Sequence, residues 1–370
     1  MKIGITCYPT YGGSGVVAAE LGKGLAKNGH EIHFISYRMP SRLDCCHDRI
    51  YFHEVEVLSY PLFEYPPYAL SLASKMGEII EYQNIEILHV HYCIPHSISG
   101  YIAKQISNKK DIKLITTLHG TDITLVGNDP SFLSVTKFGI EVSDGVTAVS
   151  NYLKNRTYKE FNVSKEIQTI YNFVDTKIFR RIEDNGLKER FAPKGEKIIS
   201  HISNFRPLKR IDNVVNIFNF ILKELDAVLL LIGDGPDRVK AEMMCREMNI
   251  CDRVKFLGKQ DCIVGILSVS DLFLMPSELE SFGLSALEAM SCEVPVIASD
   301  VGGLKELITE NTGYLIDKDD IEGMAKKGVE VLSDENLKKF VGKNARKRVE
   351  EFFDIDVIVP QYEKYYEKVH

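Results

Sequence analysis

The chain has 370 residues, of which 45% are hydrophobic and 26% are charged, a composition typical of a globular protein with two or three domains. Its formal net charge of −7 argues against a nucleic-acid-binding protein, which normally carries a basic face. No apolar run approaches the ~18 residues that cross a bilayer, and the opening MKIGITCYP lacks the apolar core and cleavage site of a signal peptide. We therefore expect a cytoplasmic protein that does not insert into membranes.

The cysteines are typical of free thiols. None forms a C-x-x-C pair, and several lie in apolar, strand-like contexts, so we expect buried thiols in a reducing cytosol. The run Cys45-Cys46-His47 invites comparison with a metal site, but it lacks the paired ligand spacing of a zinc motif. The eight cysteines are Cys7, Cys45, Cys46, Cys93, Cys245, Cys251, Cys262 and Cys292.

Short apolar runs alternate with helical stretches in the first half of the chain, a pattern that indicates a parallel sheet with crossover helices. After the first run, KIGITCY, a glycine-rich turn leads into a helix with Val17, Leu21 and Leu25 at helical spacing, which Asn28-Gly29 ends. The expected strands are residues 2–8, 31–37, 85–92, 112–119, 145–150 and 167–172.

The same alternation begins again in the second half. Two successive α/β units of similar size are more natural than one sheet of more than about ten strands. We therefore predict an α/β fold of two Rossmann-like domains facing across a cleft, the first over residues 1–170 and the second over 171–351. The expected strands of the second half are residues 197–203, 227–233, 253–258, 271–276, 295–299 and 313–316.

The C-terminal region reads as helical from about residue 319 to 369, without a strand signal. We expect residues 352–370 to form a helix that packs back on the first domain. The basic stretch from Lys338 to Arg348 could suggest a membrane-surface helix. A solvated helix face is the better interpretation, because four apolar residues offer a core-facing stripe. These residues are Leu337, Phe340, Val341 and Val349.

The turn after the first strand carries a phosphate-binding pattern. Residues 13–18, GSGVVA, fit G-x-G-x-x-G/A between a strand and a helix, so the amides of Gly13, Ser14 and Gly15 can face a pyrophosphate. The motif alone supports a nicotinamide dehydrogenase as readily as a sugar-nucleotide enzyme. A dehydrogenase requires an acidic residue after the second strand, where this chain has Arg38, which at best suits NADP. A turn that only allows close packing is a further interpretation.

Two glutamates lie seven residues apart in the segment ELESFGLSALEAMSCEVPVIASDVGG. Glu280 falls in the loop after a predicted strand, and Glu288 falls inside the helix that follows. Both should point into the cleft at the carboxyl end of the sheet, where open α/β folds bind ligands. Carboxylates suit the hydroxyls of ribose and sugar, while free amides at a helix start suit a phosphate. The candidate amides are those of Phe282, Gly283 and Leu284.

This segment resembles the E-x7-E signature of the retaining glycosyltransferases with two Rossmann-like domains, the GT-B fold of glycosyltransferase family 4. The resemblance extends over essentially the whole chain and includes SNFRPLKRID, LLLIGDGP and GGLKEL. The N-terminal half is similar to the branch that transfers N-acetylglucosamine to L-malate, the first step of bacillithiol synthesis. This similarity rests on GITCYP-x-x-GGSGVVAAELG, EIHFIS, FEYPPY-x-L-x-LASKM, LHVHY-x-IPH and TTLHGTDIT.

The resemblance implies a role for several residues on the donor side. Arg206 and Lys209 would hold the diphosphate of UDP-N-acetylglucosamine, with Arg210 as an alternative to Lys209 and Asn204 beside them. Cations fit this position because the departing UDP gains negative charge in the transition state. Glu288 would hold the ribose hydroxyls, Glu280 the hydroxyls of the transferred sugar, and His119 would contact that sugar. Of His89 and His91, at least one reads as a packing or hydrogen-bonding residue.

The same resemblance implies a reaction without metal or cofactor. UDP is a good leaving group once its charge is neutralised, so no general acid is needed, and the donor's own phosphate oxygen would take the proton of the incoming hydroxyl. No convincing D-x-D metal motif accompanies the site residues. Basic side chains and the positive end of a helix would replace a metal ion.

The acceptor implied by the resemblance is L-malate, held by the first domain. Two carboxylates on a four-carbon acid need fixed donors and at least one cation. Lys137 and Arg156 are the available charges, although each could equally be a solvated helix residue. The candidate acceptor-binding residues are Tyr92, Thr121, Lys137, Asn151 and Arg156, with Ser14 as a further donor.

Three alternatives remain open at this point: a transferase of the same fold with another acceptor, a UDP-sugar epimerase, and an NADP oxidoreductase that uses the Gly13 turn. The sequence also leaves open whether the chain forms a homo-oligomer.

Overall fold

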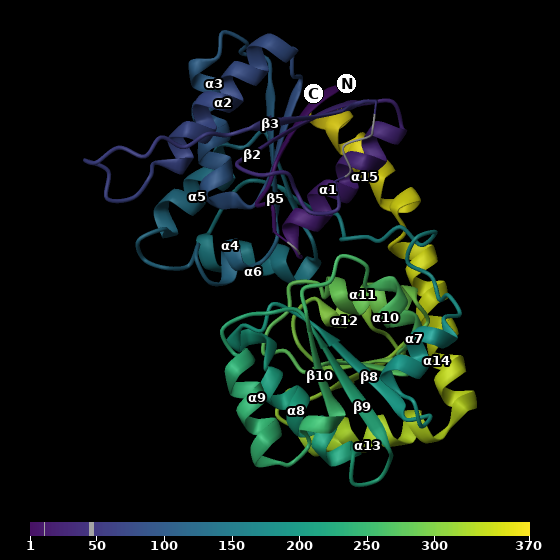
Figure 1. Ribbon diagram of the computed structural model, residues 1–370. Helices are drawn as coiled ribbons and strands as arrows, with labels where there is room; N and C mark the ends of the chain where they lie inside the picture. Colours follow the sequence, from purple (N-terminus) through teal and green to yellow (C-terminus); the bar gives the residue numbers. More distant parts are fainter. Residues whose placement is uncertain (11, 44–47) are drawn as a thin grey trace. The chain divides into compact units, whose positions relative to one another are not determined.

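The computed structural model describes residues 1–10, 12–43 and 48–370, so the run Cys45-Cys46-His47 lies outside the described residues. The chain divides into two compact units, Met1–Asn172 with Ile355–His370, and Phe173–Asp354 (Figure 1). The sequence analysis placed the boundaries between the two domains at residues 170/171 and 351/352. Each unit is built on one parallel sheet, so the α/β class with two Rossmann-like domains is confirmed. None of the described helices combines the length and the apolar composition needed to span a membrane.

The sheet of the first unit has seven parallel strands in the order β3-β2-β1-β4-β5-β6-β7. They are β1 (Lys2–Thr6), β2 (Glu31–Ser36), β3 (Ile50–Glu54), β4 (Ile87–His91), β5 (Lys113–Leu118), β6 (Gly145–Ala148) and β7 (Ile167–Thr169). Six of them overlap the expected strands, whereas β3 was not expected. As an edge strand with one neighbour, β3 leaves Tyr51 exposed, and its apolar run, Ile50 to Phe52, is only three residues long.

The helices of the first unit include two that are far apart in the chain and pack together. A side chain at Gly24 in α1 would put its Cβ 2.7 Å from Val359 in α15, so the two helices approach closely (Figure 1). The helices are α1 (Ser14–Lys27), α2 (Tyr68–Gln83), η1 (Cys93–Ser97), α3 (Ile98–Ile106), α4 (Thr121–Thr124), α5 (Leu133–Val142), α6 (Asn151–Phe161) and α15 (Ile355–Val369).

The sheet of the second unit has six parallel strands in the order β10-β9-β8-β11-β12-β13. They are β8 (Lys197–Ile202), β9 (Ala227–Ile232), β10 (Val254–Gly258), β11 (Leu272–Met275), β12 (Val296–Ser299) and β13 (Tyr314–Ile316). All six expected strands of this half are present. The helices are α7 (Asn185–Phe191), η2 (Pro207–Lys209), α8 (Ile211–Ile221), α9 (Arg238–Glu247), η3 (Cys251–Arg253), α10 (Val264–Val269), α11 (Leu284–Ser291), α12 (Leu304–Leu307), α13 (Ile321–Ser333) and α14 (Glu335–Phe352).

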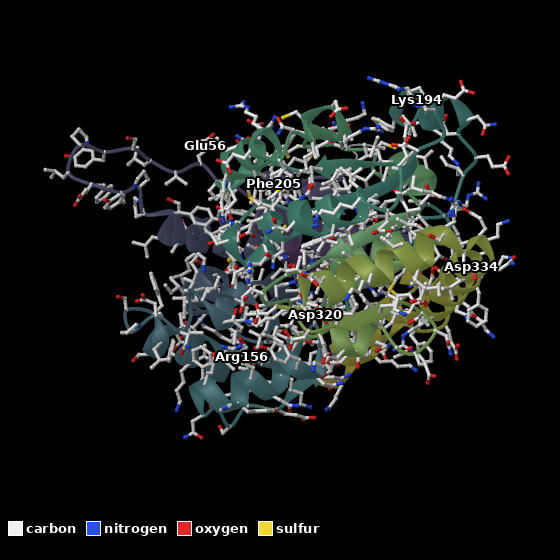
Figure 2. All side chains as sticks on the ribbon, turned by 90° about the horizontal axis from the view of Figure 1, so that it is seen from below. Glu56, Arg156, Lys194, Phe205, Asp320 and Asp334 are labelled. Carbon is white, nitrogen blue, oxygen red and sulfur yellow. The ribbon has the colours of Figure 1, made fainter. Side chains whose placement is uncertain are left out.

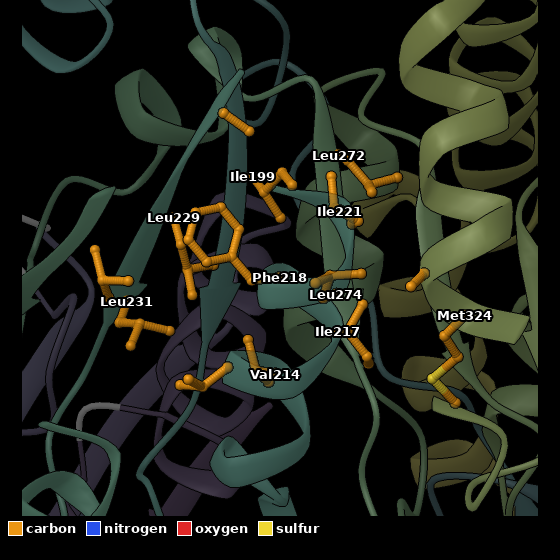
Figure 3. Close-up of a cluster of buried hydrophobic side chains, with 14 of the residues drawn as sticks. Ile199, Val214, Ile217, Phe218, Ile221, Leu229, Leu231, Leu272, Leu274 and Met324 are labelled. Atoms are coloured by element: carbon orange, nitrogen blue, oxygen red, sulfur yellow. The ribbon is translucent and has the colours of Figure 1, made fainter. Parts of the chain in front are cut away.

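The core of the second unit forms where α8 lies on the sheet. Its apolar residues recur at helical spacing, so one face of the helix is continuous and fully buried. Phe218 and Ile221 pack in one cluster with Leu229 and Leu231 of β9 and with Met324 of α13 (Figure 3). Each such side chain contributes about 1.5–3 kcal/mol when it is fully buried, which fixes the helix on the sheet.

Aspartates define where the two long helices of this unit begin. The side chain of Asp320 accepts the Gly323 amide at the start of α13, and that of Asp334 accepts the Asn336 and Leu337 amides at the start of α14 (Figure 2). Capping side chains of this kind satisfy amides that have no partner within the helix.

Half of the basic residues of α14 form the solvated face expected from the sequence, and the other half make structural contacts. The exposed residues are Lys339, Lys343 and Lys347. Lys338 is buried, and its Nζ lies 2.6 Å from Asp271 Oδ1 and 2.8 Å from Glu335 Oε1. The guanidinium of Arg346 donates to backbone carbonyls, and so does that of Arg348. Phe340, expected in the core-facing stripe, is 52% exposed.

We predict that Lys338→Ala destabilises the second unit by about 3 kcal/mol. The variant leaves Asp271 as an uncompensated charge, and this carboxylate is only 5% exposed. Differential scanning calorimetry should show a lower Tm for the transition of this unit. The matched control is Lys343→Ala, an exposed lysine on the same helix. Equal shifts for the two variants would contradict the prediction.

Candidate active site

Each sheet has a topological switch point near its centre. In the first unit the chain leaves β1 toward β2 on one side and returns at β4 on the other, and in the second unit the same reversal falls between β8 and β11. Loops that leave such neighbouring strands diverge at the carboxyl edge, which is where open α/β folds bind ligands. The segments after these strands contain most of the residues that the sequence analysis singled out.

In the second unit, a lysine that follows β8 meets a glutamate that follows β11. Lys209 Nζ lies 2.5 Å from Glu280 Oε1, and Ser277 Oγ donates to the same oxygen at 2.9 Å. Glu280 is 7% exposed, and these two donors hold its carboxylate in one orientation. Ser277 was not predicted, because a serine in a loop gives no signal beyond the turn it belongs to.

The neighbouring arginine is committed to a different carboxylate. Arg210 Nη1 donates to Glu278 Oε2 at 2.9 Å, and Lys318 Nζ donates to Glu278 Oε1. These two hydrogen bonds hold the pKa of Glu278 below its ordinary value. Of the two candidates for a diphosphate-binding cation, Lys209 is therefore the one beside Glu280, and Arg210 is engaged by Glu278.

The turn after β8 projects polar side chains on either side of a buried ring. Phe205 is fully buried at a φ of 38°, while Asn204 and Arg206 on its two sides are exposed (Figure 2). Arg206 has no ion pair among the described residues. The LIGDGP segment supports this turn, because a Cβ on Gly233 would lie 1.8 Å from the Ser203 carbonyl oxygen.

The second glutamate lies on α11, whose start is shaped by glycines. Glu288 is 4% exposed, and Gly283 caps the helix at a φ of 99°. Gly303 donates its amide to the Glu280 carbonyl at 2.9 Å, and a Cβ there would lie 2.1 Å from the Ser281 carbonyl oxygen. The GG pair of GGLKEL therefore holds the loop that carries Glu280. The Phe282 ring is buried, and Leu284 is half-buried as the first residue of α11.

In the first unit the glycine turn has two distinct parts. A Cβ on Gly15 would lie 2.4 Å from the Tyr8 carbonyl oxygen, so this glycine is required for packing of α1 against the turn. Gly13, at a φ of 60°, has no atom of the described residues within 4 Å of its Cβ position, and Ser14 beside it opens the helix. The open part of the turn is therefore at Gly13 and Ser14.

His119 follows β5 and contacts a second histidine. Its Nε2 lies 2.9 Å from His91 Nδ1, and the ring is half-buried. Burial lowers the pKa of His119 to about 3 and that of His89 likewise to about 3. His89 is hydrogen-bonded to Tyr366 OH and to Thr117 Oγ1. Both histidines of LHVHY are thus hydrogen-bonding residues of the interior.

An aspartate that the sequence analysis did not single out ties two loops together. The Asp122 carboxylate accepts the backbone amides of Cys93 at 2.9 Å, of His119 at 3.1 Å and of Gly120 at 2.7 Å. Burial raises the pKa of Asp122 to about 6, although these amides oppose the shift. The sequence feature that could have indicated Asp122 is its position three residues after His119, in the segment HGTD at the end of a strand.

The candidate acceptor-binding residues fall into two groups. Tyr92, Thr121 and Asn151 follow β4, β5 and β6 within three residues, at the carboxyl edge of the sheet. Lys137 and Arg156 lie further along α5 and α6. Tyr92, at a φ of 90°, packs edge-on against Tyr8, and Asn151 donates to Tyr171 OH at 2.9 Å. Arg156 Nε donates to Glu160 at 2.6 Å and Nη1 to Tyr152 OH at 2.8 Å, whereas Lys137 is exposed.

Within residues 1–10, 12–43 and 48–370, no cluster of three or more histidine, cysteine, aspartate or glutamate side chains is arranged to hold a metal ion.

Comparison with known proteins defines the class. Residues 11–178 match the family model of Glycosyltransferase Family 4, and residues 183–348 match that of Glycosyl transferases group 1. The fold is similar to that of sucrose-phosphate synthase from Thermosynechococcus elongatus, with a TM-score of 0.82 and 23% identity over 100% of this chain and 98% of that chain. HepE of Anabaena in complex with UDP-glucose gives a TM-score of 0.80 and 18% identity over 100% of both chains. The fold is that of a GT-B glycosyltransferase.

The sequence is also similar to that of N-acetyl-alpha-D-glucosaminyl L-malate synthase of Bacillus anthracis. It is 51% identical over 368 residues, which cover 99% of this chain and 96% of the relative. The chain belongs to this family of glycosyltransferases. It is a sugar-transferring enzyme, so the NADP oxidoreductase interpretation of the Gly13 turn and the UDP-sugar epimerase alternative are both set aside.

We predict that the stability difference between the wild type and Asp122→Asn depends on pH. The folded-state pKa of Asp122, about 6, lies above its ordinary value of 3.8, so the folded protein binds the proton more tightly than the unfolded chain does. The resulting stabilisation is present at low pH and is lost as the pH rises through about 6. An asparagine cannot titrate, so the Tm of the wild type relative to the variant should be higher at about pH 5 than at about pH 8.

The control for this prediction is Asp111→Asn, which replaces an exposed aspartate of the same unit. A Tm difference for Asp122→Asn that does not change with pH would show that the carboxyl group is not perturbed.

Proposed function

We propose that the protein transfers N-acetylglucosamine from UDP-N-acetylglucosamine to the hydroxyl of L-malate, with retention of the anomeric configuration. The observation that carries this proposal is the relation to the Bacillus anthracis enzyme, whose name states the sugar and the acid. That relative matches both units along almost their full length, so the acceptor side and the donor side are covered alike. The product would be the starting glycoside of bacillithiol synthesis.

The donor would be held by the second unit. Lys209 and Arg206 supply positive charge after β8, and the β-phosphate of UDP gains negative charge as the glycosidic bond breaks. Both side-chain contacts of Glu280 fall on Oε1, so Oε2 is the oxygen that we assign to a hydroxyl of the transferred sugar. Glu288 on the buried face of α11 is assigned to the ribose. The amides from Phe282 to Leu284, at the start of α11, remain predicted phosphate ligands, and Asn204 a predicted donor ligand.

The acceptor would be held by the first unit. A dicarboxylic 2-hydroxy acid needs hydrogen-bond donors and a cation, and Ser14, Tyr92, Thr121 and Asn151 are the donors at strand ends. Of the two candidate cations, Arg156 is already compensated by Glu160, so Lys137 is the one whose charge we assign to a carboxylate. These assignments depend on the acceptor being L-malate.

The chemistry that we propose uses neither a metal ion nor a cofactor. Neutralisation of UDP by Lys209 and Arg206 makes it a leaving group that needs no general acid. The donor's own phosphate oxygen would accept the proton of the incoming hydroxyl. A cytosolic location remains a prediction.

We expect incubation of the protein with UDP-N-acetylglucosamine and L-malate to yield UDP and a glycoside that mass spectrometry identifies as N-acetylglucosaminyl malate. In excess EDTA the rate should stay within about twofold of the control, because basic side chains and a helix terminus take the place of a metal. Loss of activity in EDTA with rescue by magnesium or manganese would make the enzyme metal-dependent. Product from inositol phosphate or a lipid acceptor but not from malate would leave only the broader transferase assignment.

We predict that Arg206→Ala and Lys209→Ala each lower kcat by about a hundredfold while the KM for the donor rises much less. The reason is that the charge they stabilise develops mainly in the transition state. Arg210→Ala is the discriminating comparison, because that arginine binds Glu278; we expect a loss of no more than about fivefold. Similar losses for Lys209→Ala and Arg210→Ala would contradict the assignment of Lys209.

A further inference from the structure

A chain of aromatic side chains links the C-terminal helix to His119. The hydroxyl of Tyr366 in α15 lies 2.8 Å from His89 Nδ1, and His89 Nε2 lies 2.7 Å from Thr117 Oγ1. The rings of His89 and His91 pack with their centroids 4.4 Å apart. His91 Nδ1 in turn lies 2.9 Å from His119 Nε2. Every group in the chain is buried except His119, which is half-buried at the carboxyl end of β5.

The contact between His91 and His119 restricts where their protons lie. Burial lowers the pKa of His119 to about 3 and holds that of His91 well below its ordinary value, so both rings are neutral at neutral pH. A neutral imidazole has one N–H and one lone pair, and a hydrogen bond between two rings needs one of each. The shared proton is therefore on either His91 Nδ1 or His119 Nε2.

The remaining nitrogen of His91 favours the first arrangement. His91 Nε2 is buried and has no hydrogen-bond partner among the described residues. Buried N–H groups without a partner are rarer than under-satisfied acceptors, so this nitrogen should carry a lone pair. His96 provides a parallel: its Nδ1 donates to the His91 carbonyl oxygen at 2.6 Å, which leaves its buried Nε2 as an unpaired acceptor. His91 then donates from Nδ1, and the proton of His119 is on Nδ1.

We propose that His91 holds His119 as the neutral Nδ1–H tautomer, so that Nδ1 donates a hydrogen bond to a neutral oxygen of the substrate, and that Tyr366 and His89 are positioning residues that fix the His91 ring by packing. Taking that oxygen as a hydroxyl of the transferred sugar rests on the proposed function. Among the described residues His119 Nδ1 has no partner, so it is the ring nitrogen open to a ligand. In this tautomer Nε2 is occupied by His91 and Nδ1 already carries a proton. His119 therefore acts as a hydrogen-bond donor and not as a general base.

The tautomer can be measured directly by nitrogen NMR of the full chain labelled with ¹⁵N-histidine, with His119→Asn to assign the signals. The expected result is a protonated Nδ1 and an unprotonated Nε2 for His119 in the wild type. His91→Leu, which removes the donor, should allow the other tautomer, whereas His91→Asn should preserve the first, because its amide NH₂ can replace Nδ1. A wild-type His119 protonated on Nε2 would overturn the proposal.

Kinetics provide a second readout. We expect His91→Leu to lower kcat about tenfold with a smaller change in the KM for the donor, and His91→Asn to restore activity to within about threefold of the wild type. Tyr366→Phe keeps the buried ring but removes the hydroxyl, and we expect a loss of roughly threefold. The matched control is His53→Leu, which breaks a histidine–histidine contact of the same length, 2.9 Å, between His33 and His53 in the same unit. It should change neither kcat nor the tautomer of His119.

The outcomes separate this inference from the proposed function. Equal kinetic losses for His91→Leu and His91→Asn, or wild-type kcat in a folded His91→Leu, would overturn the positioning role. If His91→Leu does not fold, the comparison of Tyr366→Phe with His53→Leu decides, and equal kcat values for these two would count against the network. If the wild type forms no glycoside, the proposed function fails, but the tautomer measurement needs no substrate and still decides the state of His119.

Discussion

Within each unit, backbone segments at the carboxyl end of the sheet pack so closely that no side chain fits between them. Gly15 lies against the turn after β1, Gly233 against the turn after β8, and Gly303 against the loop after β11. At each contact a single methyl group would collide with a carbonyl oxygen, so the loops are locked to one another by main-chain packing. Lys209 and Glu280 project from these locked loops, and for this reason their ion pair is a fixed element of the second unit and not a fluctuating surface pair.

The polar side chains at the carboxyl ends of the two sheets differ in charge. In the second unit the carboxylates of Glu278 and Glu280 are each matched with lysine or arginine, and Arg206 adds an exposed charge. At the strand ends of the first unit, the histidines are held neutral by burial and offer hydrogen bonds without charge. This difference fits the proposed division of labour, because a departing diphosphate requires cations, whereas the hydroxyl assigned to His119 requires only an oriented neutral donor.

The sequence predicted strands both at the centre and at the edges of the sheets, because most of them appear as apolar runs. Edge strand β3 was missed, because its apolar run is only three residues long and Tyr51 within it faces solvent. The glutamate pair could be located because glycines and a helix start surround it. Ser277 could not, because a loop serine has no pattern of its own. Asp122 and Tyr366 were missed because each binds a residue that is distant in the sequence, Cys93 and His89 respectively. The contacts of Lys338, Arg346 and Arg348 in α14 were missed for the same reason, because the carbonyls and carboxylates that bind them come from distant segments.

The path of the chain affects the order in which the protein can be completed during synthesis. The second unit is one continuous segment, whereas the first unit needs α15, which the ribosome adds only after all of the second unit has been made. The tyrosines of α15 are fully or almost fully buried in the first unit. Until they arrive, the side of that unit that α15 covers stays exposed to solvent. The unit that is synthesised first is therefore the last to reach its native state. Chaperones that bind apolar surface on nascent chains would bind this unit and not the second one.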